Sequence, residues 1–197
     1  MVRIGVTGLM ASGKSTVARR FEARGASLVE GDQLGWLVLR RPEVRDALLA
    51  AFGERVRGAD REVNRDALGR IVFGDAAAMD DLNRIVQPVL LGSVREKIAG
   101  AQGPVVVLDA ALLTVWRLEP ELDGVVEVTA PEGTRVIRLG AARECSEEEA
   151  RARIRGQSLP PVRGARRHWR IENSGDPAAL ARKTDEVWEE IAALART

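Results

Sequence analysis

The segment from Gly8 to Thr16 has the residue types and the spacing of a loop that binds phosphate. It reads GLMASGKST, with Gly8, Gly13, Lys14 and Ser15 at the four positions that define such a loop. Glycines let backbone N–H groups close around phosphate oxygens, and the start of the following helix adds donors and a positive dipole end. We expect Lys14 to reach the terminal phosphates of a nucleotide and Ser15 to hold Mg²⁺.

The residues on either side of the loop favour the same interpretation. Residues 2–6 form a short apolar run typical of a buried strand, and residues 17–22 are typical of the first turns of a helix. An ordinary Gly/Ser-rich turn between strand and helix is the alternative. The predicted nucleotide contacts in the loop are Gly8, Ala11, Ser12, Gly13, Lys14, Ser15 and Thr16.

Composition limits the classes of protein to consider. The chain has 197 residues, 45% of them hydrophobic, which fits one domain with insertions and a substantial core. A net charge of +1 gives no overall attraction to nucleic acid or to a membrane surface. Cys145 is the single cysteine, which excludes an internal disulfide and favours a reducing cytoplasm. The longest apolar stretch, residues 105–116, is interrupted by Asp109 and is too short to span a bilayer.

Short apolar segments that alternate with helical patterns predict an α/β fold with a parallel sheet covered on both faces. Predicted helices cover most of residues 33–100 and then begin near residues 131, 146 and 177, and residues 116–123 are expected to form a loop. In such sheets ligands bind at the carboxyl ends of the strands. The phosphate loop, Asp32 and Asp109 all follow predicted strands, so we expect them to converge. The predicted strands are residues 2–6, 26–29, 104–108, 124–129 and 168–171.

Motifs after the phosphate loop narrow the prediction from a phosphate-binding protein to one family. After the loop come GASLVEGDQL, FGERV, NRDALGRIVF, IVQPVL, VVLDAALL, ARIRGQ and IENSG. In this order and approximate spacing the chain resembles the dephospho-CoA kinase family over residues 2–188. The resemblance implies a P-loop NTPase fold with a five-stranded parallel sheet flanked by helices, a helical acceptor-binding insertion and a short lid. It also implies a cytoplasmic enzyme that phosphorylates the ribose 3′-hydroxyl of dephospho-CoA with ATP and Mg²⁺.

The same resemblance divides the chain into parts of one kinase domain. The core comprises about residues 1–30, 101–137 and 169–197, the acceptor-binding insertion about residues 31–100, and the lid about residues 138–168. Asp32 matches the second acid of the family's Asp-Ala-Asp segment and is expected to be the catalytic carboxylate that faces the acceptor hydroxyl. Its alternative role is to cap the helix that follows.

Other residues are assigned through the same resemblance. Asp109 is expected to hold Mg²⁺ or a metal-bound water, or alternatively to be a buried carboxylate that supports the loop. Arg138 and Arg143 of the lid are expected to neutralise the transferring phosphoryl group, unless they are solvated surface groups. Asn173 is expected beside the ATP base, or in an ordinary turn that caps the last helix. Gln157 and Arg163 match lid residues by their spacing from Glu172.

The departures from the family pattern fall mainly on the acceptor side. Glu30 replaces the first acid, Trp36 stands where a histidine often follows, and Gln87 precedes proline in place of histidine. Ala111 and Val115 replace a proline and a glutamate. These changes leave two alternatives open, a kinase for another nucleoside or small metabolite and a regulator that binds nucleotide without turnover. The basic run of residues 163–170 is better explained by lid arginines than by nucleic-acid binding.

Overall fold

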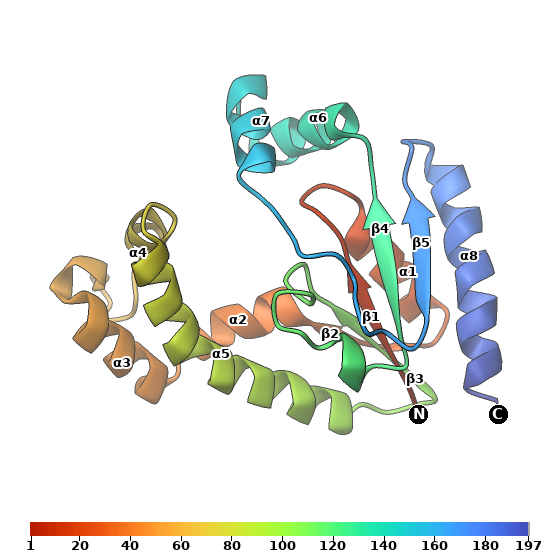
Figure 1. The fold of residues 1–197 in the computed structure, drawn as a ribbon, viewed down its shortest axis with the longest axis horizontal. Coiled ribbons are helices and arrows are strands. Elements are labelled where there is room, and N and C mark those ends of the chain that lie inside the picture. Colours follow the sequence, from red (N-terminus) through yellow and green to blue (C-terminus); the bar gives the residue numbers. More distant parts are fainter. Residues whose placement is uncertain (197) are drawn as a thin grey trace. The chain divides into compact units, whose positions relative to one another are not determined.

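Five parallel strands form one sheet. The computed structural model describes residues 1–196, and its sheet has the order β2-β3-β1-β4-β5 (Figure 1). The residues of β1 face β3 on one side and β4 on the other, so Val6 pairs with both Asp109 and Val126. The strands are β1 (Val2–Thr7), β2 (Ser27–Glu30), β3 (Val105–Asp109), β4 (Gly124–Thr129) and β5 (His168–Glu172).

The strands form because their valine-rich segments suit a pleated surface that is buried on one or both faces. β3 is buried at every position. One face of the sheet, which includes Ile4 and Val6 of β1 and Val126 and Val128 of β4, packs into the main hydrophobic core with residues of two helices. Those helices are α1 (Lys14–Ala23) and α8 (Pro177–Leu194).

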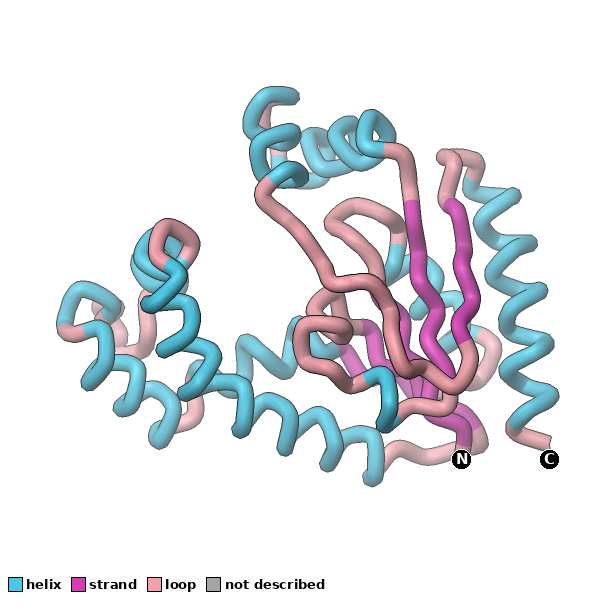
Figure 2. The backbone as a smooth tube through the Cα atoms, viewed as in Figure 1, coloured by secondary structure: helices cyan, strands magenta, loops and turns pink. Residues whose placement is uncertain are grey.

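Two further helices connect β4 to β5 along the chain. They are α6 (Glu132–Arg143) and α7 (Glu147–Arg155), which pack together through a small apolar cluster of Val136, Leu139, Ala150 and Ile154. In Figure 2 a loop carries the chain from α7 back to β5. The start of α7 is fixed by a capping box, in which Ser146 accepts from the Glu149 N–H and Glu149 accepts from the Ser146 N–H.

The chain divides into two compact units. The core unit comprises residues 1–31 and the chain from Gly100 onward, and the helical unit comprises residues 32–99. Within the helical unit, α5 packs against both α3 and α4. Pro88 lies inside α5, and the Asn64 side chain caps α4 by accepting from the Ala67 N–H. The helices are α2 (Gly31–Leu39), α3 (Pro42–Phe52), the 3₁₀ turn η1 (Glu54–Val56), α4 (Arg65–Val72) and α5 (Ala76–Ala99).

The predicted fold is confirmed, because each predicted strand is present within one residue of its expected ends. Two local predictions need correction. The first helix begins at Lys14, three residues earlier than expected, so the last residues of the phosphate loop already form its first turn. The expected loop of residues 116–123 contains the 3₁₀ turn η2 (Glu119–Glu121). Across residues 1–196, none of the helices is both long enough and apolar enough to cross a bilayer.

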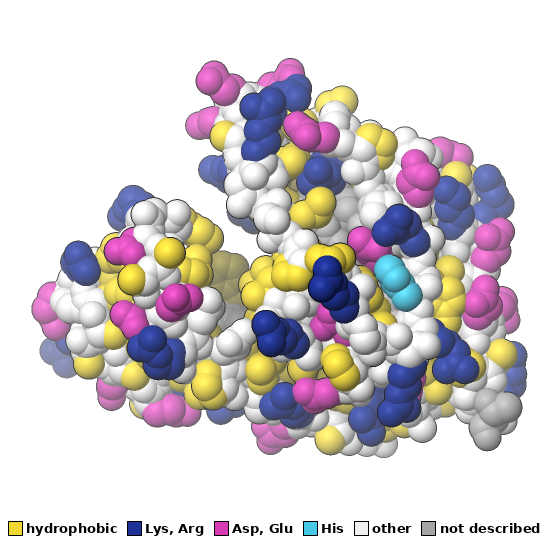
Figure 3. Space-filling view, in the orientation of Figure 1, with side chains coloured by type: hydrophobic (Ala, Val, Ile, Leu, Met, Phe, Trp, Pro, Cys, Tyr) yellow, Lys and Arg dark blue, Asp and Glu magenta, His cyan; other side chains and the backbone are white. Residues whose placement is uncertain are grey.

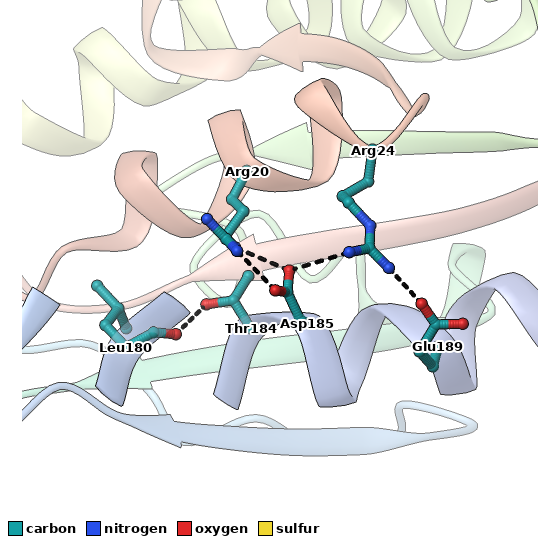
Figure 4. Close-up of polar contacts among 6 residues, drawn as sticks. All are labelled: Arg20, Arg24, Leu180, Thr184, Asp185 and Glu189. Atoms are coloured by element: carbon teal, nitrogen blue, oxygen red, sulfur yellow. Dashed lines mark hydrogen bonds and ion pairs between the residues drawn. The ribbon is translucent and has the colours of Figure 1, made fainter. Parts of the chain in front are cut away.

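Ion pairs connect α1 to α8 at the surface of the core unit (Figure 4). Arg20 donates two hydrogen bonds to Asp185, at 2.8 and 2.6 Å, and Arg24 contacts both Asp185 and Glu189. The hydrogen bond from Arg20 holds the pKa of Asp185 below its ordinary value, and the positive charges of Arg20 and Arg24 act in the same direction. This network holds the helix that starts at the phosphate loop.

We predict that Asp185→Asn lowers the midpoint of urea unfolding modestly at neutral pH, as expected for a solvent-screened pair. Because the pKa of Asp185 is lower in the folded chain than in the unfolded chain, the pair stabilises the fold above the unfolded-state pKa. That stabilisation is lost as the pH falls through the folded-state pKa. The difference between wild type and variant should therefore shrink in acid, as followed by unfolding midpoints over a pH series.

The matched control is Glu186→Gln, which removes the same charge from the next residue of α8. Glu186 is exposed and has no ion pair among the described residues. Its effect should be small at every pH. Equal effects of the two substitutions, or an Asp185→Asn effect that persists unchanged in acid, would contradict the assigned role of the pair.

Candidate functional site

The loop between β1 and α1 has the backbone geometry that its glycines make possible. Gly13 has φ of 99° and a Cβ there would collide with the Asn173 side chain, so only glycine fits. At Gly8 a Cβ would collide with the backbone oxygen of Val128 on the neighbouring strand. Ala11 also has a positive φ, of 60°. The loop is therefore drawn tightly against the ends of β4 and β5.

Several donors of this loop are left for a ligand. The backbone N–H groups of Ala11, Gly13 and Ser15 donate no hydrogen bond to any of the residues that the structure describes. The Ser12 hydroxyl is buried and also lacks a partner among them. By contrast, the N–H of Thr16 donates to Gly13 O, so that donor is used within the helix. Unpaired donors at a helix start fit the phosphate oxygens of ATP.

Lys14 and Asp109 form a buried ion pair at the edge of this loop. The distance from Lys14 Nζ to Asp109 Oδ1 is 2.5 Å, and the two side chains are only 11% and 6% exposed. Asp109 is the last residue of β3 and lies beside the end of β1 in the sheet. The convergence predicted for the loop and Asp109 is present. The pair corresponds to the alternative in which Asp109 supports the loop, and metal binding by Asp109 stays a prediction.

The residues at the loop suit Mg²⁺ held mainly by substrate. No group of three or more His, Cys, Asp or Glu among residues 1–196 is arranged to hold a metal ion. Mg²⁺ commonly needs only one or two protein oxygens, because phosphates and waters complete its shell. Ser15 in the first turn of α1 and Asp109 at the end of β3 supply oxygens of this kind.

Arg138 and Asn173 contact the loop itself. Asn173 is 3% exposed, and its Nδ2 donates to Ser12 O at 2.8 Å. Its Oδ1 accepts a hydrogen bond from Arg138 Nη2 at 2.9 Å. Arg138 Nη1 also lies 3.5 Å from the backbone oxygens of Ala11 and Ser12. Both side chains thus hold the loop backbone, a role that the sequence did not indicate.

The other residues assigned to the predicted lid differ in their surroundings. Arg143 is exposed at the end of α6 and makes no hydrogen bond to the loop. Gln157 does contact it, because its Oε1 accepts from the Met10 N–H at 2.5 Å. Arg163 makes a long contact through its backbone N–H, 3.5 Å from Oε1 of the buried Glu119.

Asp32 lies in the helical unit, and its place relative to the phosphate loop stays a prediction. The alternative in which Asp32 caps the next helix is wrong, because α2 already begins at Gly31 and Asp32 lies in its first turn. In the same unit Trp36 is 45% exposed, and the guanidinium of Arg65 stacks over its ring with the carbon 2.7 Å from the ring centroid. This contact occupies one face of the tryptophan that replaces the family's histidine.

Comparisons with known proteins identify the family. The family model described as dephospho-CoA kinase matches residues 2–178. A dephospho-CoA kinase from Thermobifida fusca is 37% identical over 194 residues, which are 97% of this chain and 96% of that protein. A crystal structure of a Thermus thermophilus protein aligns with a TM-score of 0.78 and 32% identity, over 96% of this chain and 97% of the other.

A dephospho-CoA kinase from Campylobacter jejuni supports the fold alone, with a TM-score of 0.66 at 19% identity over 97% of both chains. The predicted resemblance and the prediction of an ATP-dependent kinase are confirmed by the family match and by the T. fusca relative. The chain belongs to the dephospho-CoA kinase family.

Proposed function

We propose that this chain transfers the γ-phosphoryl group of ATP to the ribose 3′-hydroxyl of dephospho-CoA. The observation that carries the proposal is the phosphate loop with unpaired backbone donors, in a chain matched by the dephospho-CoA kinase model over residues 2–178. The acceptor oxygen forms a bond to the γ-phosphorus while the bond from that phosphorus to the β–γ bridging oxygen breaks. ADP leaves, and the hydroxyl proton passes late to a carboxylate.

Four residues of the loop have separate roles in that transfer. The N–H groups of Ala11, Gly13 and Ser15 bind phosphate oxygens, and Lys14 moves from Asp109 toward the terminal phosphates as charge shifts to the leaving group. Ser15, together with Asp109 directly or through a water, would hold Mg²⁺, and the ion would supply positive charge that offsets the charge of the phosphates. A fixed set of donors of this kind stabilises the transition state because little reorganisation is needed.

The roles outside the loop follow the family pattern. We assign to Asp32 the orientation of the acceptor hydroxyl and the uptake of its proton. Arg138 and Arg143 are assigned to the transferring phosphoryl group, and Asn173 to the ATP base side of the site. Arg138 can act in this way if it exchanges its present contacts with the loop backbone for phosphate oxygens.

We propose that the helical unit is the acceptor-binding insertion and that residues 138–168 form the lid of a single kinase domain. The enzyme is expected to act in the cytoplasm, in line with its single free cysteine. Its partners are then the small molecules ATP and dephospho-CoA, without nucleic acid or membrane. On the face drawn in Figure 3, positive side chains are interspersed with negative ones, and they do not form the broad basic surface typical of a nucleic-acid-binding protein.

The acceptor is tested by comparing dephospho-CoA with adenosine under saturating Mg-ATP. We predict saturable phosphorylation of dephospho-CoA and a kcat/KM for adenosine that is lower by about a hundredfold or more. The pantetheine arm should contribute binding energy that helps to position the reacting hydroxyl. Equal specificity constants, or no turnover of dephospho-CoA by a protein that phosphorylates another metabolite, would replace this function with that of a different small-molecule kinase.

Asp32→Asn tests the assigned carboxylate. The variant should keep its affinity for ATP, while its kcat falls by about 10²- to 10⁴-fold, the range typical for loss of an acid–base group. Calorimetry with Mg-ATP and steady-state kinetics measure the two quantities separately. Asp80→Asn, an exposed position on α5 of the same unit, is the control and should behave as wild type. Loss of ATP affinity with retained turnover would make Asp32 a nucleotide or metal ligand instead.

A further inference from the structure

The core unit contains a cavity of about 380 Å³ beside the phosphate loop. Its walls include Thr7, Gly8 and Leu9 at the end of β1 and residues 127–130 at the end of β4. β1 and β4 are neighbours, but the chain leaves β1 toward β2 on one side of the sheet and leaves β4 toward β5 on the other. Adjacent strands whose connections diverge in this way form the crevice in which open α/β sheets bind ligands.

The cavity lies on the face of the sheet opposite the main core. Val126 and Val128 of β4 point into that core, so the alternation of the strand turns Glu127 and Thr129 to the other face. Residues 157–162, which follow α7 and include Pro160 and Pro161, form another wall of the cavity. The hydrogen bond from the Met10 N–H to Gln157 holds the start of this segment on the phosphate loop.

The side chains of the walls do not favour a phosphate group. None of the described residues that line the cavity is a lysine or an arginine. They include Thr7, Thr114 and Thr129, and one carboxylate, Glu127. A triphosphate in such a space would face a negative charge without a cation to offset it. A neutral ring that carries hydrogen-bond donors suits these walls better.

Two polar groups at the cavity have unused hydrogen-bonding capacity. Thr114 is 5% exposed, and its hydroxyl has no partner among the described residues, although a buried hydroxyl is usually paired. Glu127 uses Oε2 to accept from Arg170 Nε at 3.2 Å and to pair with His168 Nε2 at 3.1 Å. Its Oε1 has no hydrogen-bond partner within residues 1–196.

We propose that this cavity holds the nucleoside of the acceptor, with Glu127 Oε1 accepting from the exocyclic amine of its adenine and the Thr114 hydroxyl making a second hydrogen bond. The proposal rests on the proposed function, because it takes dephospho-CoA as the acceptor. The position of the cavity agrees with this assignment, because the cavity lies beside Gly8 and Leu9, where the phosphate loop leaves β1. Asn173, assigned to the ATP base side, contacts the helix end of the loop at Ser12. Glu127 and Thr114 are thus specificity residues on the acceptor side.

The test combines two substitutions with two acceptors, dephospho-CoA and its analogue in which an unsubstituted purine replaces adenine. Wild type should prefer the adenine compound by about tenfold in kcat/KM, the effect of one hydrogen bond to a charged group. Glu127→Gln should largely abolish that preference. Thr114→Val, which keeps the side-chain shape, should raise the KM for dephospho-CoA about five- to tenfold and leave the KM for ATP unchanged. Comparing both enzymes with both acceptors separates the loss of this hydrogen bond from a general loss of activity in the variant.

Thr184→Val is the matched control, because it removes a buried threonine hydroxyl from α8 that donates to Leu180 O. It should change neither KM. A raised KM for ATP in Thr114→Val would assign the cavity to the donor nucleotide and overturn the proposal. Wild-type kinetics in both cavity variants would also overturn it while leaving dephospho-CoA kinase activity in place. If the wild-type protein did not phosphorylate dephospho-CoA, that result would instead contradict the proposed function.

Discussion

The side chain of Asn173 is the contact on which the geometry of the phosphate loop depends. When a loop turns its N–H groups toward a ligand, its carbonyl groups need hydrogen-bond donors from other parts of the chain. For the Ser12 carbonyl this donor is Asn173 Nδ2. The same residue donates its backbone N–H to Thr129 O at 2.7 Å and accepts from Arg138 Nη2. Through its backbone and its side chain, this one buried residue therefore joins the ends of β4 and β5, the helix α6 and the loop.

The buried pair of Lys14 and Asp109 has a different role. Taking both charges out of water costs free energy that their attraction offsets only in good geometry, so the pair is a weak source of stability. The pair does fix the position of the Lys14 ammonium, because the ammonium contacts Asp109, the last residue of β3. The loop is consequently held from two sides, by Asn173 on its backbone and by Asp109 on its lysine, before a nucleotide binds. Such prior ordering lowers the cost of reorganisation during phosphoryl transfer.

The sequence predicted those features whose signals are local. Valine-rich runs such as residues 105–108 predicted buried strands, and the spacing of Gly8, Gly13 and Lys14 predicted the loop. The contact between Gln157 and Met10 joins residues far apart in the chain, and no local pattern specifies which backbone group a distant amide meets. The stacking of Arg65 on Trp36 was missed for the same reason.

The cavity was also beyond sequence reasoning, although one signal was present. Glu127 interrupts the apolar segment GVVEVT, and alternation along a strand places it on the face opposite Val126 and Val128. The position of residues 157–162 beside this face depends on the path of the chain after α7. The roles of Asp32, Arg143 and the other site residues stay predictions, because the family pattern suggests them and no contact described above tests them.

Phosphoryl transfer by this chain should be directed to one particular hydroxyl of dephospho-CoA, the ribose 3′-hydroxyl. Proton and phosphorus NMR of the purified product of a reaction with dephospho-CoA and Mg-ATP tests it most directly. We expect one new phosphate monoester signal, coupled to the ribose 3′-proton, in an amount equal to the ADP formed. A phosphate on the 2′-oxygen, or ADP and inorganic phosphate without a phosphorylated acceptor, would contradict it.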